Sequence, residues 1–87
     1  MSIGATQSQD QAVSFGAGAE EFYRLGLMYS TGETVPADMV TAHKWFNIAA
    51  MRGSREAVRH RRDLAQEMSS ADIAAAQRAA RSWLTRH

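Results

Sequence analysis

Three histidines, His43, His60 and His87, are the side chains of this chain best suited to acid–base or metal chemistry. Only His60 has a carboxylate at helical spacing, because Glu56 precedes it by one helical turn and would lie on the same face. Two ligands are too few for a zinc site, which uses three or four protein side chains. We therefore interpret Glu56 and His60 as a solvated helix pair and predict no metal site.

Other arrangements typical of catalysis are also missing from the sequence. No serine–histidine–aspartate grouping stands out, and the chain has no cysteine. Gly16 and Gly18 follow no predicted strand, as a phosphate-binding loop would require. Glu20 and Glu21 are adjacent, so on a helix they point to different faces and make a poor general acid–base pair. We predict a protein that is not an enzyme and uses no cofactor.

A row of arginines is the strongest charged feature. Arg55, Arg59 and Arg62 would line one face of a helix. Guanidinium groups bind phosphates and carboxylates, so the row could serve as a contact for an anion, a nucleic acid or an acidic protein surface. We favour the alternative, a solvated face neutralised in part by Glu56 and Asp63. Nucleic acid is further disfavoured, because no aromatic residues interleave the arginines.

Charge is distributed unevenly along the chain. Residues 1–42 hold one basic and five acidic residues, whereas residues 43–87 hold nine basic and four acidic ones, within a net charge of +1. Such segregation lets one end of the molecule pair with another molecule, or lets two copies pair with each other. Self-association into a structural unit is therefore one alternative function.

Length and composition predict a single small all-α domain. The 87 residues are 45% hydrophobic and rich in alanine, methionine, leucine, glutamate and arginine, which favour helix. No apolar stretch reaches the roughly 18 residues that a membrane span needs. Residues 1–18 lack the basic start and apolar centre of a secretory signal, so we expect a cytoplasmic protein.

The pattern predicts a flexible tail at residues 1–17, followed by four helices in a domain covering residues 18–87. In the first helix, Glu21, Leu25 and Tyr29 form the expected inner stripe, and Gly32 ends it. Asp38 is placed to cap a second helix that stops at Gly53. The remaining helices are predicted at 54–68 and 71–86, which gives two antiparallel hairpins, a fragment of an α-solenoid.

The aromatic residues of the later helices are predicted to pack in the core, because they alternate with alanines at helical spacing. Trp45, Phe46 and Trp83 are therefore interpreted as core residues and not as a ligand cage. Phe46 faces about 100° away from Trp45 on a helix. We expect it to reach a neighbouring unit instead of the hairpin interior.

Residues 21–53 also carry small and aromatic residues in a fixed order. The residues of this motif are Leu25-Gly26, Met28-Tyr29, Gly32, Val35-Pro36-Ala37-Asp38, Ala42, Trp45-Phe46, Ala49-Ala50 and Gly53. The order resembles the Sel1-like repeat, a relative of the tetratricopeptide repeat. Glu21 departs from the small residue expected at the first position, and Glu33-Thr34 stands where glycine is usual. The rest of the chain resembles the degenerate ending of such repeats in bacterial proteins, since Arg61-Arg62 replaces the expected Leu-Gly.

This resemblance implies a protein–protein interaction module, an adaptor or an accessory subunit. In such families the first helix of each hairpin lines the contact surface, which points to Tyr23, Arg24 and Leu27 as partner-binding residues. Leu27 is the strongest candidate, because it is large, apolar and poorly placed for the hairpin core. Arg55, Arg59 and Arg62 form the second candidate surface. One repeat offers little groove, so docking on a larger protein is the favoured role.

Overall fold

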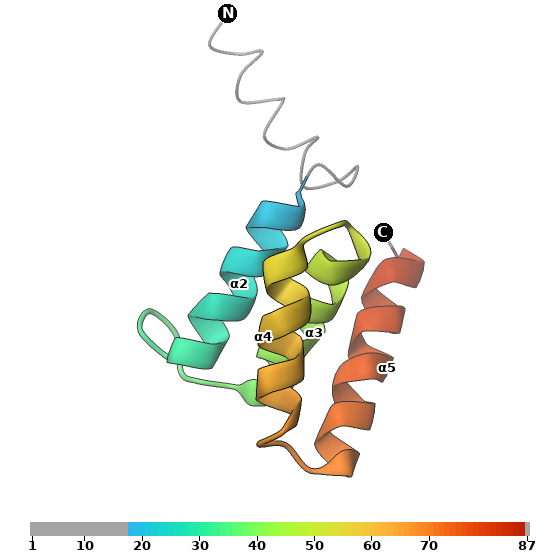
Figure 1. Cartoon of the computed structure of the whole chain (residues 1–87). Coiled ribbons are helices and arrows are strands. Elements are labelled where there is room, and N and C mark those ends of the chain that lie inside the picture. The colour runs from blue at the N-terminus through green and yellow to red at the C-terminus, as the bar shows by residue number, and fades with distance from the viewer. Residues whose placement is uncertain (1–17, 87) are drawn as a thin grey trace, which may run out of the picture.

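The computed structural model describes residues 18–86, and within that range the chain forms four α-helices and no strand. They are α2 (Ala19–Thr31), α3 (Met39–Met51), α4 (Arg55–Ala65) and α5 (Ser70–Arg86). Successive helices run in opposite directions, so residues 18 and 86 lie at the same end (Figure 1). The predicted all-α class is confirmed, whereas the predicted tail at 1–17 and His87 lie outside the described residues.

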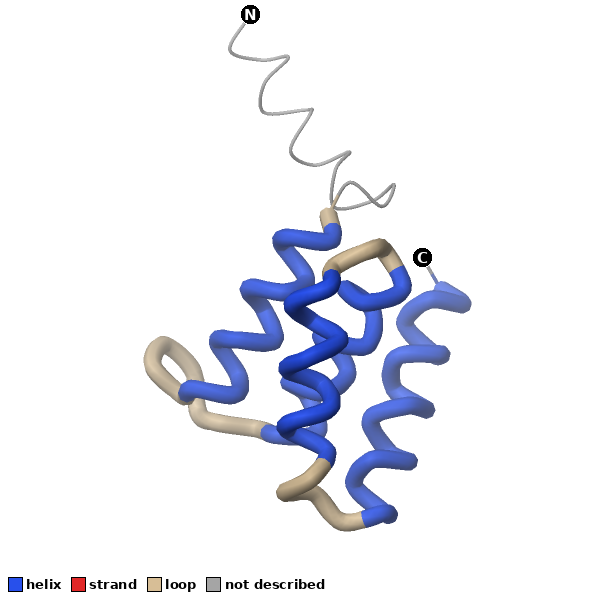
Figure 2. Tube along the Cα trace, viewed as in Figure 1, coloured by secondary structure: helices blue, strands red, loops and turns tan. Residues whose placement is uncertain are grey.

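Helix α3 is the centre of the fold. It packs against α2, α4 and α5, whereas α2 and α4 contact each other much less (Figure 2). Every residue of α3 except Met51 is at least partly buried. A helix that is covered on all sides must be apolar on most of them, and α3 carries charge only at Lys44 beyond its histidine. The outer helices therefore each cover one side of α3.

The hairpin between α2 and α3 closes through two local signals that the sequence predicts. Gly32 adopts a left-handed conformation with φ of +73°, and its amide donates to the Met28 carbonyl at 3.0 Å. Asp38 accepts a hydrogen bond from the Thr41 amide at 3.1 Å and another from the Thr41 hydroxyl at 2.8 Å. The left-handed C-terminus and the aspartate cap are both confirmed.

Serine caps set the boundaries of the last two helices. Ser54 accepts from the Ala57 amide at 3.1 Å, and Ser69 accepts from the Asp72 amide at 3.0 Å. Helix α4 ends three residues before the predicted position 68. Residues 66–68 instead form tight turns, in which the amide of Met68 bonds to a carbonyl three residues back.

The inner face of α2 is centred one position away from the predicted stripe. Phe22 is 1% exposed and Gly26 is buried, whereas Glu21, Leu25 and Tyr29 are only partly buried. Leu25 and Tyr29 pack against the core as predicted, but the most buried positions of α2 are Phe22 and Gly26, so the centre of the stripe is shifted by one residue. Counting from Glu21 would have placed a carboxylate inside, while burial of the Phe22 ring removes more apolar surface from water.

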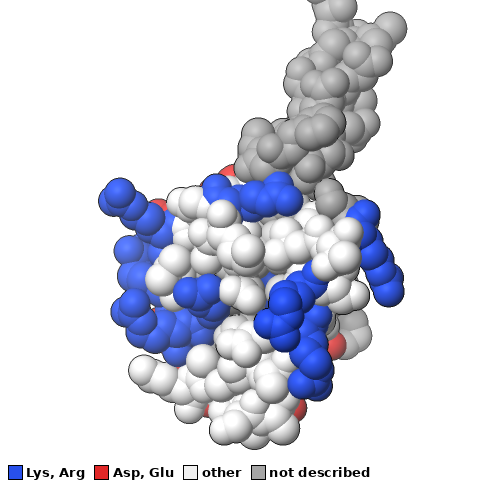
Figure 3. Space-filling model, turned by 90° about the vertical axis from the view of Figure 1, so that its right-hand side faces the viewer, with Lys and Arg blue, Asp and Glu red and all other residues white. Residues whose placement is uncertain are grey.

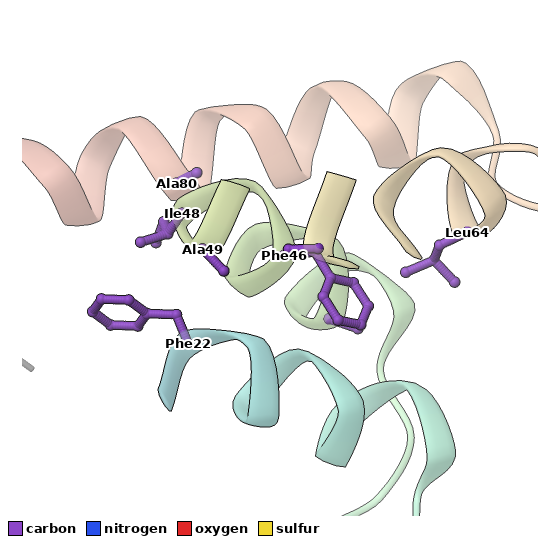
Figure 4. Close-up of a cluster of buried hydrophobic side chains, with 8 residues drawn as sticks. Phe22, Phe46, Ile48, Ala49, Leu64 and Ala80 are labelled. Carbon is purple, nitrogen blue, oxygen red and sulfur yellow. The ribbon is translucent and has the colours of Figure 1, made fainter. Parts of the chain in front are cut away.

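Phe46 lies in the interior between α2 and α3, where it is 1% exposed (Figure 4). The expectation that it reaches a neighbouring unit is wrong, and Gly26 is the reason. A Cβ atom added to Gly26 would overlap the Phe46 ring, so only glycine leaves room for that ring against α2. The side chain that comes closest to α2 at Gly26 is thus a phenylalanine.

Three aromatic rings tie α5 to the α2–α3 hairpin. The rings of Phe22 and Trp45 stack with centroids 5.7 Å apart, and Trp83 meets them edge-on at 5.2 and 5.6 Å. Farther along the same contact, the buried side chains of Ile48 and Ala80 lie beside each other (Figure 4). The tryptophans pack against the core, as predicted.

Candidate functional site

A hollow lined mainly by residues of α2 lies on the outer face of that helix. It has a volume of about 370 Å³ and forms where the second half of α2 meets the following loop. The lining residues are Arg24, Leu27, Met28, Thr31, Glu33 and Thr34, which we call the α2 groove. Two of the three partner-binding residues predicted on this helix therefore lie together.

Arg24 stands at the edge of the α2 groove. Its Nε lies 4.0 Å from a Glu20 carboxylate oxygen, and its Nη1 lies 3.7 Å from one of Glu21. The Arg24 side chain is still 63% exposed, so the paired carboxylates hold it without covering it. Exposed ion pairs of this kind contribute little to stability. The guanidinium can therefore be contacted by another molecule without loss of the fold.

The floor of the groove is apolar. Leu27 and Met28 are both partly buried, and Leu27 packs against the edge of the hydrophobic core. Leu27 is thus better placed for the core than the sequence analysis expected, although one side of it faces the groove. Glu33 and Thr34 close the far end from the loop.

Tyr23 does not belong to the α2 groove. It is partly buried on the side of α2 that faces α4. The centroid of its ring lies 5.3 Å from that of the His60 ring and 6.0 Å from that of the Phe46 ring. The structure therefore separates Tyr23 from Arg24 and Leu27, with which the sequence analysis grouped it. Its ring helps to join α2 to α4.

A second, smaller pocket of about 160 Å³ lies between α2 and α4. The lining residues are Ser30, Phe46, His60, Asp63, Leu64 and Glu67, which we call the α4 pocket. Its floor is made by apolar side chains of the core, while Asp63 and Glu67 stand exposed at its rim. The sequence analysis did not group these residues, because they come from three different helices and the turn after α4.

His60 differs from the solvated pair that the sequence analysis proposed. Its Nδ1 lies 3.0 Å from the backbone oxygen of Glu56, and its ring packs against those of Tyr23 and Phe46. The pairing with a Glu56 carboxylate is therefore wrong. Aromatic contacts from α2 and α3 cannot be read from spacing within α4.

His43 is the buried polar side chain of the core, at 3% exposed. Its Nδ1 is buried and has no hydrogen-bond partner among the described residues. Burial, and to a lesser degree the charge of Arg61, keeps the pKa of His43 below its ordinary value of 6.5. Arg61 itself donates to the Asn47 side-chain oxygen at 2.7 Å. Both effects favour the neutral form of His43 in the folded chain.

We expect the folded chain to lose stability as the pH falls below 6.5. Above that value His43 is neutral in both states, whereas below it the unfolded chain takes up a proton that the folded chain resists. The loss continues until the pH reaches the lowered folded-state pKa, with a slope of at most about 1.4 kcal/mol per pH unit. The loss of stability is measured as the difference between the urea unfolding midpoints at about pH 7.5 and about pH 5.5. The His43→Leu variant should show a smaller difference, and an unchanged difference would refute this assignment.

Four groove residues were not predicted from the sequence, and they reach the groove in two different ways. Met28 and Thr31 follow Arg24 by one and two helical turns, so helical spacing could have grouped them with it. Glu33 and Thr34 reach the groove only because the chain reverses at Gly32. Placing Glu33 and Thr34 in the groove therefore requires the geometry of the turn, because helical spacing does not extend past Gly32.

The described residues give no sign of a metal site or of a membrane-spanning helix. Among residues 18–86, no group of three or more histidine, aspartate or glutamate side chains could hold a metal ion. No helix in that range is both long enough and apolar enough to span a membrane. Comparison with known protein families, curated proteins and solved structures finds no match for the chain.

Proposed function

We propose that this chain is a small non-catalytic protein-interaction module, an accessory subunit or adaptor that docks on a larger protein through the α2 groove. The observation that carries the proposal is the juxtaposition of Arg24 and Leu27 in one hollow. Binding hot spots combine an arginine or a large apolar side chain with a pocket that excludes water. The α2 groove provides an apolar floor and a charged edge.

The chemistry of the groove favours a protein as its occupant. The apolar floor suits an apolar side chain of a partner, and the exposed Arg24 guanidinium suits a carboxylate beside it. Glu33, at the opposite end, suits a basic residue. A helix or loop that carries an apolar residue between opposite charges would satisfy all three contacts.

The Sel1-like assignment of residues 21–53 is part of the same proposal. Gly26, Ala42 and Ala49 are buried at the contacts of α3 with its neighbours. Any tightly packed helical hairpin needs small residues at such contacts. The family assignment therefore depends on the order of the motif residues.

Leu27→Asp and Arg24→Glu are each expected to weaken partner binding by about 30-fold, the loss typical of a hot spot worth about 2 kcal/mol. The tagged full-length chain is used to capture proteins from its native cells, and the captured protein is identified by mass spectrometry. The purified partner is then titrated with each variant by calorimetry.

Arg81→Glu on α5 is the matched control, since it makes the same charge change at an exposed residue outside the groove. Leu27 also touches the core, so its substitution affects packing as well as the groove. Thr31→Lys is therefore added as a third groove variant, at an exposed position. Circular dichroism checks the helicity of each variant. Partner binding that survives all three groove changes would rule out this surface.

A further inference from the structure

The arginine row of α4 lacks the carboxylate partners that sequence spacing predicts. Arg55, Arg59 and Arg62 are all exposed, as expected. Within residues 18–86, however, the two ion pairs at 4.0 Å or less both belong to Arg24. Glu56 and Asp63 therefore form no direct ion pair with this solvated row, and both kinds of charge remain open to another molecule.

Four of these exposed charges form one continuous ridge along α4 and the turn after it. Residues spaced by four lie one above the next on a helix surface, and Arg55, Arg59 and Asp63 have this spacing within α4. Glu67, in the turn after α4, lines the same pocket as Asp63 and so continues the row. All four side chains are exposed. The ridge therefore reads as two positive charges followed by two negative charges. We call it the α4 ridge.

Such a ridge is complementary to itself when it is reversed. In an antiparallel pair related by a twofold axis that passes between Arg59 and Asp63, Arg59 of one copy faces Asp63 of the other, and Arg55 faces Glu67. A twofold axis makes each of these contacts twice, so four opposite-charge pairs form. Ridges of residues spaced by four are also the surfaces through which helices most often pack.

The α4 pocket lies beside the acidic half of the ridge. Asp63 and Glu67 stand at its rim, while Phe46 and Leu64 form its floor. An arginine has an apolar stem and a charged end, so its stem can cover such a floor while its guanidinium meets the rim carboxylates. The antiparallel arrangement brings Arg59 of a second copy to this rim.

We propose that the chain forms a twofold dimer in which α4 pairs antiparallel with α4 of a second copy, each inserting Arg59 toward the α4 pocket of the other. The proposal commits to a second copy because the ridge supplies both signs of charge in matching order. Lysine and arginine side chains spread more widely, over the face that α5 presents, but that face shows carboxylates only at its edges (Figure 3). It offers no such self-complementarity.

This dimer is independent of the α2 groove, which lies on the outer face of α2. Its contacts are polar, so it belongs with small and transient interfaces and depends on salt. Two copies joined through α4 would present two α2 grooves. A partner with two matching sites would then bind with increased avidity.

The mass of the purified full-length chain, measured by sedimentation velocity from about 10 µM to about 500 µM, tests the dimer. At about 20 mM salt the mass should rise with concentration from the 9.6 kDa monomer toward twice that value, and it should fall back at about 500 mM salt. A constant monomer mass at low salt overturns the proposal. A mass that continues beyond a dimer indicates open head-to-tail assembly and overturns it as well.

Charge reversal and charge swap identify the contact. Arg59→Glu and Asp63→Arg should each weaken dimerisation at least about 10-fold, because each change places like charges opposite each other twice. The double variant Arg59→Glu/Asp63→Arg should restore dimerisation, since it rebuilds both pairs with the signs exchanged. Arg81→Glu on α5 should leave dimerisation within about threefold of the original. Failure of the double variant to restore it, with helicity intact by circular dichroism, contradicts the α4 pairing.

Discussion

Phe46→Ala should remove most of the free energy of unfolding, the largest loss of stability expected for a single change in this chain. The Phe46 ring is 1% exposed and lies against the α2 backbone at Gly26. Replacing a buried phenylalanine with alanine typically costs about 3–5 kcal/mol. A domain of this size has a total stability near the low end of about 5–15 kcal/mol, so little remains. Circular dichroism during urea unfolding measures the loss.

Met51→Ala is the matched control for Phe46→Ala. Met51 lies on the same helix, α3, but is 64% exposed, so its truncation removes little buried surface. We expect its unfolding midpoint to stay close to that of the original chain, within about 0.5 kcal/mol. Equal losses for the two variants would mean that Phe46 does not lie in the α2–α3 interior.

Gly26→Ala should destabilise the chain by up to about 2 kcal/mol net, although the same change stabilises most helices. Alanine is favoured over glycine inside a helix by about 1 kcal/mol. At Gly26, however, the added methyl group would overlap the ring of Phe46, which is enclosed and cannot move away freely. Overpacking typically costs about 1–3 kcal/mol, which outweighs the gain in helix propensity.

A second substitution, at Phe46 facing Gly26, separates the cost of overpacking from the gain in helix propensity. Phe46→Leu makes the facing side chain smaller, so Gly26→Ala should cost less in that background than in the original chain. The free energies of unfolding of the two single variants and the double variant give a coupling of about 1 kcal/mol or more. If Gly26→Ala raises the unfolding midpoint in the original background, the close contact with Phe46 is incorrect.

The sequence predicts the helices well where local chemistry sets them. Gly32 and Asp38 terminate and cap helices through bonds to residues three or four positions away, so both are visible in the sequence. The choice between Glu21 and Phe22 as the inner residue of α2 is decided by which helix lies opposite. The same holds for Phe46, whose place depends on Gly26, twenty positions earlier in the chain.

The candidate sites also contain some residues that helical spacing predicts and others whose place depends on a neighbouring helix. Arg24 and Leu27 could be grouped from helical spacing, and the structure places both in the α2 groove. Tyr23 was grouped with them because spacing alone does not show that α4 covers that side of α2. The free charges of Arg59 and Asp63 were missed for a related reason. Their spacing allows an ion pair within α4, and only side-chain geometry shows that the pair is not made.

The central claim, that a partner docks in the α2 groove, is tested most directly by photo-cross-linking. A benzophenone amino acid is placed at Thr31, which lines the groove, and in a separate variant at Ser82, an exposed position on α5. After illumination in the native cells, we expect an adduct of one defined mass from the Thr31 position and none of that mass from the Ser82 position. The same adduct from Ser82, with none from Thr31, would contradict the claim.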